Sequence, residues 1–162
     1  LGPLGAGSRS CIGGWGRSGW VAGVLRLVDL SGAWVRRDDM IGYVTIGVTD
    51  MEKAKSFYSE LLAPLGASVQ MSMDRIAFIG KAMNEPMIAV CIPYDEKDPS
   101  PGNGNMIAIN PGSKENVDKF YQRAKELGAT CEGEPGQRIP DMFYGGYVRD
   151  PDGNKLCFFQ FG

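Results

Sequence analysis

The sequence predicts an α+β domain over residues 40–162, built from two copies of one βαβββ unit. The segments 42–68 and 105–130 share the same order of apolar strand, polar helix start and amphipathic helix. In each helix Phe-Tyr stands near the middle and Leu-Gly-Ala marks the end. Three strand-like stretches follow each helix. A lone four-stranded sheet with one helix leaves its other face uncovered, so we expect the two units to share a core.

The first unit begins with a strand over Ile41–Val48, where β-branched residues are frequent. Thr49 and Glu52 have the spacing of a capping box, which predicts that a helix starts with Thr49 as its N-cap. One face of this helix is apolar, and Gly66 is placed to end it. The members of that face are Met51, Ala54, Phe57, Tyr58, Leu61, Leu62 and Leu65. We expect the three following strands over Ser68–Met73, Arg75–Gly80 and Met87–Pro93.

The second unit follows a loop over Pro93–Gly104 and repeats this plan. Ser113 is the expected N-cap of its helix, and Gly128 is placed to end that helix. The apolar face consists of Val117, Phe120, Tyr121, Ala124 and Leu127. We expect the strands over Thr130–Glu132, Phe143–Arg149 and Lys155–Phe161, with a tight turn at Asp152-Gly153-Asn154.

Residues 1–39 differ in composition from the rest of the chain. They hold all three tryptophans, nine of the 23 glycines and five basic residues that are all arginine. We interpret the segment as an N-terminal extension, either a leader, a vector-derived tail or read-through of upstream sequence. An organelle transit peptide is the alternative, because the segment bears arginine and is poor in acidic residues. Its glycine content predicts poor order, although the stretch 19–30 has the pattern of a short docking element.

Charge and cysteine usage exclude several classes of protein. The formal charge of −2 gives no electrostatic reason to bind nucleic acid or anionic membranes. No apolar run reaches the roughly 18 residues of a membrane-spanning helix. The four cysteines form no C-x-x-C pair, which favours a reduced, cytoplasmic protein over a disulfide framework. The chain has no histidine, the commonest transition-metal ligand and the usual proton shuttle near neutral pH.

Three stretches of residues 40–162 resemble the vicinal oxygen chelate superfamily. They are YVTIGVTDMEKAKSFYSELLAPLGA, PGNGNMIAI and FYGGYVRDPDGNKL. That superfamily includes glyoxalase I, bleomycin-resistance proteins, fosfomycin-resistance thiol transferases and extradiol dioxygenases. The resemblance implies a curved, open eight-stranded mixed sheet with the helices on its outer face and a ligand site on its concave face. It also implies a homodimer, and the uncovered edges of an open sheet give a physical reason for one.

The resemblance places the superfamily's metal ligands, usually histidine and glutamate, at Tyr43, Met106, Cys157 and a position near Ala89. Phenol, thioether and a single thiol do not make a site for Zn²⁺, Mg²⁺, Mn²⁺ or Fe²⁺. We therefore predict no metal site and no cofactor. The metal-dependent glyoxalase and dioxygenase reactions have no support beyond the fold.

Strand alternation predicts an apolar and aromatic cleft with a few polar groups. Its predicted ligand-binding residues are Tyr43, Thr45, Met106, Asn110, Phe143, Tyr147, Cys157 and Phe159. Cys157 is a candidate nucleophile and Tyr43 a candidate general acid, but a buried strand thiol and a pocket-shaping ring are the simpler interpretations. Such a cleft suits a small organic ligand. The 12 basic and 16 acidic residues of 40–162 favour one that is neutral or cationic.

Two functional hypotheses follow. The first is a metal-free small-molecule-binding protein, which holds its ligand as bleomycin-resistance proteins do. The second is a glyoxalase-like lyase, a transferase or an isomerase with a metal-free or non-standard site that uses Tyr43, a carboxylate or Cys157.

Overall fold

The computed structural model describes residues 40–162, so the expectations for residues 1–39 lie outside it. In chain order the elements are β1 (Tyr43–Gly47), α1 (Met51–Leu62), a 3₁₀ turn (Ala63–Leu65), β2 (Ser68–Ser72), β3 (Ile76–Gly80), β4 (Met87–Cys91), β5 (Ile107–Ile109), α2 (Lys114–Glu126), β6 (Thr130–Ile139), β7 (Phe143–Arg149) and β8 (Lys155–Phe161). Neither helix is long and apolar enough to cross a membrane.

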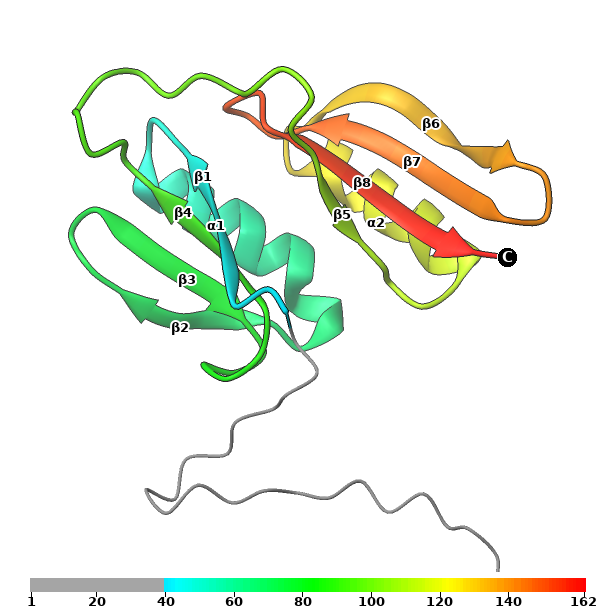
Figure 1. Cartoon of the computed structure of the whole chain (residues 1–162), viewed down its shortest axis with the longest axis horizontal. Helices are drawn as coiled ribbons and strands as arrows, with labels where there is room; N and C mark the ends of the chain where they lie inside the picture. The colour runs from blue at the N-terminus through cyan, green and yellow to red at the C-terminus, as the bar shows by residue number, and fades with distance from the viewer. Residues whose placement is uncertain (1–39) are drawn as a thin grey trace, which may run out of the picture. The chain divides into compact units, whose positions relative to one another are not determined.

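The eight strands form two four-stranded mixed sheets, with the orders β1-β4-β3-β2 and β5-β8-β7-β6 (Figure 1). In each sheet the first strand of the unit pairs in parallel with the last, and the other pairs are antiparallel. This confirms the α+β class and the two βαβββ units. The sheets stay open, and hydrogen bonding divides the eight predicted strands into four and four.

The two units share one hydrophobic core, as predicted. Helix α1 buries Phe57, Tyr58 and Leu61, and α2 buries Phe120 and Tyr121. Residues of both helices belong to one cluster with side chains of β1, β3, β4, β7 and β8. Gly66 and Gly128 take positive φ angles of 80° and 102° just after the helical segments. These left-handed ends satisfy the terminal carbonyl groups and stop both helices at the predicted places.

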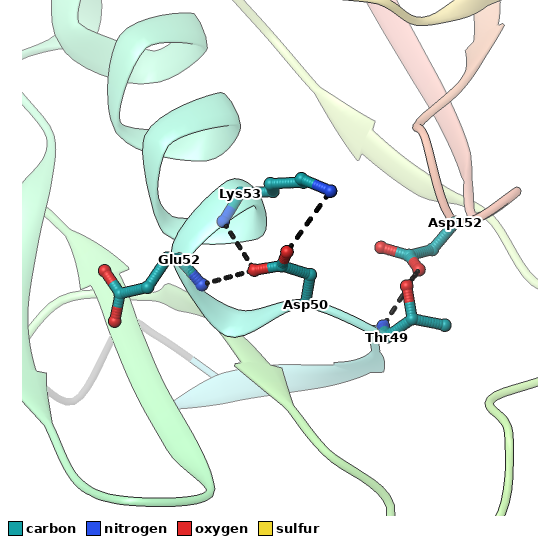
Figure 2. Close-up of polar contacts among 5 residues, drawn as sticks. All are labelled: Thr49, Asp50, Glu52, Lys53 and Asp152. Carbon is teal, nitrogen blue, oxygen red and sulfur yellow. Dashed lines mark hydrogen bonds and ion pairs between the residues drawn. The ribbon is translucent and has the colours of Figure 1, made fainter.

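The predicted start of the first helix is wrong by one residue. Asp50, not Thr49, is the N-cap, and its Oδ1 accepts hydrogen bonds of 3.1 Å from the backbone N–H groups of Glu52 and Lys53 (Figure 2). A carboxylate suits this position because it also meets the positive end of the helix dipole. The backbone N–H of Lys53 is the largest cause of the lowered pKa of Asp50.

The predicted extent of the sixth strand is also wrong. The sequence predicts Thr130–Glu132, but β6 continues to Ile139 with three shifts in register against β7. The extension contains Gly133, Pro135 and Gly136, and in a sequence these residue types usually indicate the end of a strand. An edge strand tolerates proline and bulges because one side of its backbone has no partner strand.

The turn between β7 and β8 connects the second unit to the first. Asp150 is 3% exposed. Its Oδ1 accepts from the backbone N–H groups of Asp152 and Asn154 at 3.0 and 2.7 Å. Its Oδ2 accepts from the Tyr58 hydroxyl at 2.6 Å and from Asn154 Nδ2 at 2.9 Å. Burial, followed by the Asp150 charge, raises the pKa of Tyr58 well above its ordinary value. The tyrosine therefore remains a hydrogen-bond donor at neutral pH.

Thr49 and Asn154 add two further bonds between the units. The backbone N–H and the hydroxyl of Thr49 both donate to Asp152 Oδ1, at 2.9 and 2.6 Å (Figure 2). Asn154 Nδ2 donates to the backbone oxygen of Gly47 at 3.0 Å. Thr49 thus forms hydrogen bonds to the second unit instead of capping its own helix.

We predict that Tyr58→Phe lowers the free energy of unfolding by about 1–3 kcal/mol, because it removes a donor from a buried carboxylate. The matched control is Tyr144→Phe, which removes an exposed 2.8 Å bond to Asp118 Oδ1. That change should cost under about 0.5 kcal/mol, as is usual for an exposed polar contact. Urea denaturation of both variants measures the difference, and equal losses would contradict the role of the buried bond.

Candidate functional site

A cavity of about 420 Å³ lies between the two units. One wall is β1, from Val44 to Gly47, and the other is Met106 and Ile107 with the loop before them. Asn154 and Lys155 line it from the turn that carries Asp150. The cavity therefore brings together Thr45 and Met106, two of the predicted ligand-binding residues.

A second cavity of about 650 Å³ borders the same two strands and is lined mostly by apolar residues of α1, β1, β4 and β5. Val44, Met106 and Ile107 line both cavities. Strands β1 and β5 are the edge strands of their sheets, so within residues 40–162 neither has a hydrogen-bonded neighbour on that side. Met106 thus lies at the junction of two spaces that both border these edges.

In the first sheet, successive residues of β1 face the core and the open side alternately, as strand geometry requires. Ile46 and Val48 belong to the hydrophobic core, and Val44 packs against it. Tyr43 is 52% exposed, and its ring meets the edge of Phe78 at 5.1 Å and 85°. Phe78 forms a small separate cluster with Met87 and Ala89 on that open face, and neither Phe78 nor Met87 is among the residues predicted to line the cleft.

The second sheet brings four predicted residues onto its open face: Phe143, Tyr147, Cys157 and Phe159. Tyr147 pairs with Cys157, and Gly145 pairs with Phe159. The rings of Phe143 and Phe159 stack at 5.5 Å and 8°. A Cβ on Gly145 would lie 2.7 Å from Phe143 Cε1, so only glycine leaves room for that ring.

Asn110 has a local role in the structure. It is exposed, and its Oδ1 accepts from the backbone N–H of Gly112 at 2.8 Å in the turn before α2. It lines neither of the two cavities. The remaining predicted residues fall into groups on the first sheet, at the cavity and on the second sheet.

Two cationic residues beside Tyr147 were not predicted from the sequence. Lys155 Nζ and the Arg138 guanidinium carbon each lie 5.3 Å from the centroid of its ring. Lys155 could have been found, because it alternates with Cys157 and Phe159 on one strand. Arg138 could not, because its position depends on the part of β6 that the sequence did not indicate.

The thiol of Cys157 is poorly suited to nucleophilic attack. The residue is fully buried. Burial raises the pKa of Cys157 to about 11, although Tyr147, Lys155 and Arg138 each lower it. A nucleophilic cysteine needs a substantial thiolate fraction at neutral pH, and a thiol with this pKa does not provide one.

The residues at the superfamily's metal positions do not fit a metal. Tyr43 and Met106 supply a phenol and a thioether, Ala89 supplies no donor, and the Cys157 thiol stays protonated. Within residues 40–162 no group of three or more acidic, histidine or cysteine side chains is arranged to hold an ion. No reaction step through a metal is therefore derived from this site.

We predict that EDTA treatment, or added Zn²⁺ or Mn²⁺, leaves the melting temperature unchanged. A metal bound by the native state at a hundred times its Kd would add about 2.7 kcal/mol of stability, which calorimetry detects easily. A clear rise in Tm with one equivalent of metal would contradict this prediction.

We also predict that iodoacetamide labels Cys131 of the native protein much faster than Cys157. Cys131 is exposed, whereas Cys157 is buried with a pKa of about 11. A pKa of about 11 leaves the Cys157 thiol almost wholly protonated at about pH 7, so its labelling should stay slow even where iodoacetamide is in large excess. Mass spectrometry of peptides measures both sites, and labelling in denaturant should remove the difference. Equal rates in the native protein would overturn this account of Cys157.

Comparison with known proteins agrees with this architecture. Residues 40–158 match the family model of the glyoxalase/bleomycin resistance protein/dioxygenase superfamily. No curated protein matches the chain. A glyoxalase/bleomycin resistance protein from Albidiferax ferrireducens is 32% identical with a TM-score of 0.67, over 75% of this chain and 98% of that one.

Two more distant structures share the fold. A glyoxalase-related enzyme from Fulvimarina pelagi is 22% identical with a TM-score of 0.60, over 74% of this chain and 86% of that one. A glyoxalase/bleomycin resistance protein/dioxygenase family enzyme from Burkholderia phytofirmans is 18% identical with a TM-score of 0.61, over 73% and 95%. With the match to the family model, the paired βαβββ units show that this chain belongs to the glyoxalase/bleomycin resistance protein/dioxygenase superfamily.

Proposed function

We propose that this protein binds a small organic molecule at the cavity between its units and on the adjoining open sheet faces, without a protein-bound metal. The observation that carries the proposal is the cavity of about 420 Å³, with Thr45 from one unit and Met106 and Lys155 from the other. Its lining combines apolar side chains of β1 with polar groups such as Asn105 and Lys155, and a concave space with a few fixed polar groups is typical of small-molecule sites.

Binding accounts for the described residues better than catalysis does. Of the two candidate catalytic groups, Cys157 is buried and protonated, which leaves Tyr43 as the accessible one. Tyr43 lines a smaller, separate cavity with Met83 and Met87, and not the cavity that holds Thr45. The two candidates therefore do not converge on one reacting centre, as the lyase, transferase or isomerase hypothesis would need.

A homodimer and a cytoplasmic location complete the proposal. Among residues 40–162 the edge strands β2 and β6 have no partner strand on their outer side, and Phe161 is 63% exposed. Uncovered edges and exposed apolar side chains favour association with a second copy. The three cysteines of that part of the chain are free, which suits a reducing compartment.

We predict that Met106→Trp weakens ligand binding by about tenfold or more, because an indole at the junction of the two cavities fills space that a ligand needs. Saturation-transfer NMR with a set of neutral and charged aromatic fragments finds ligands, and titration gives their affinities. Met40→Trp is the control, since Met40 is 95% exposed and lines neither cavity. Fragment binding that Met106→Trp leaves unchanged would place the site elsewhere.

A further inference from the structure

Two cationic side chains lie over the ring of Tyr147 on the open face of the second sheet. The Arg138 guanidinium carbon and Lys155 Nζ are each 5.3 Å from the ring centroid. Gly133, which pairs with Tyr147, leaves room for this arrangement, because a Cβ there would lie 3.1 Å from Tyr147 Cδ2 and 3.2 Å from Arg138 Nη2. The ring and both charges are therefore held together by the backbone of β6, β7 and β8.

The nearby carboxylate does not neutralise this cluster. Glu132 binds Arg149 Nη2 at 2.7 Å and Lys155 Nζ at 3.1 Å. The hydrogen bond from Arg149 is the largest cause of the lowered pKa of Glu132, which is therefore fully charged at neutral pH. The Glu132 carboxylate thus forms ion pairs with both Arg149 and Lys155, and it forms none with Arg138.

Arg138 has no ion-pair partner among residues 40–162. Its Nε donates to the backbone oxygen of Gly145 at 3.3 Å, and its Nη2 donates to the backbone oxygen of Glu134. The carboxylate of Glu134 forms no ion pair with Arg138 among residues 40–162. Within the described residues Arg138 Nη1 donates no hydrogen bond, so it is available to a ligand anion.

The same two cations also act on Cys157, which lies on this face beside Tyr147. The two that influence its thiol are Lys155 and Arg138, and both favour a negative charge there. The open face is therefore locally positive, although residues 40–162 carry more acidic than basic side chains. A local field of this sign attracts an anion whatever the net charge of the domain.

An aromatic surface adjoins the cations. Phe143 and Phe159 stack at 5.5 Å, and Phe161 meets them edge-on at 5.9 and 5.1 Å. Phe143 is on the same strand and the same face as Tyr147, four residues away, and both are half-buried. A planar apolar group can stack on these rings while a charged group reaches the cations.

We propose that this face of the second sheet recognises a small aromatic carboxylate. Its ring packs on Phe143 and Phe159, its carboxylate binds Arg138, and Lys155 reinforces the positive potential. The inference rests on the proposed function, because it names the ligand class for the part of that site on the second sheet, where Lys155 also lines the cavity between the units.

The test compares cinnamate with cinnamamide, which has the same skeleton but no charge, by isothermal titration calorimetry on the full chain. We expect cinnamate to bind about tenfold more tightly than the amide, since a charge-assisted bond to guanidinium is about twice as strong as a neutral one. Arg138→Gln should weaken cinnamate about tenfold and leave cinnamamide unchanged, whereas Arg138→Lys should restore part of the difference. Lys119→Gln, an exposed cation on α2, is the matched control and should change neither affinity.

A second measurement does not depend on any variant folding. Raising NaCl from about 0.05 M to about 0.5 M should weaken cinnamate binding and spare cinnamamide, because salt screens partly exposed charges. Equal affinities for the two probes, or equal losses of both in Arg138→Gln, would overturn the inference and leave the small-molecule proposal standing. If neither probe binds while neutral fragments still bind in a Met106-dependent manner, the inference alone has failed. If no fragment binds at all, both proposals are wrong.

Discussion

The carboxylate of Asp150 is the constraint on which the arrangement of the two units depends. It is the one charged group that is fully buried among residues 40–162. An unpaired charge in such a place costs several kcal/mol, so its partners must be held in position. Four hydrogen bonds meet this need, two from backbone N–H groups, one from the amide of Asn154 and one from Tyr58. Three of the four donors belong to its own turn, and Tyr58 belongs to the helix of the other unit.

This network also positions the candidate site. Asn154, fixed by Asp150, donates to Gly47 at the end of β1, and both residues line the cavity between the units. Lys155 follows at once as the first residue of β8 and lines the same cavity. The buried turn that stabilises the domain therefore also fixes the position of Lys155, the first residue of β8. The same strand carries Cys157 and Phe159.

The sequence alone could predict what depends on local pattern. The apolar residues around Phe57 and around Phe120 recur at helical spacing, and a glycine follows each helix. These two patterns were sufficient to predict the paired units and their shared core. The N-cap at Asp50 was missed because Thr49 and Glu52 have capping-box spacing, while the partner that draws Thr49 away, Asp152, is 103 residues distant. A contact of that sequence separation leaves no local signal.

The candidate site was predictable only in part for the same reason. Strand alternation correctly placed Phe143, Tyr147, Cys157 and Phe159 on one face. It could not show that β6 runs on past Pro135, and without that extension Arg138 has no place beside Tyr147. The unpredicted part is thus a residue whose position depends on a bulged edge strand.

The electrostatic character of the site shows the limit of arguments from net charge. The excess of acidic residues over 40–162 suggested a neutral or cationic ligand. Most of those carboxylates lie on helices, loops and turns, where water and salt screen them beyond about 10 Å. On the open face of the second sheet Glu132 is already shared by Arg149 and Lys155, and Arg138 has no acidic partner among the described residues. A ligand at this surface experiences the nearest charges most strongly, and there the sign is opposite to that of the domain as a whole.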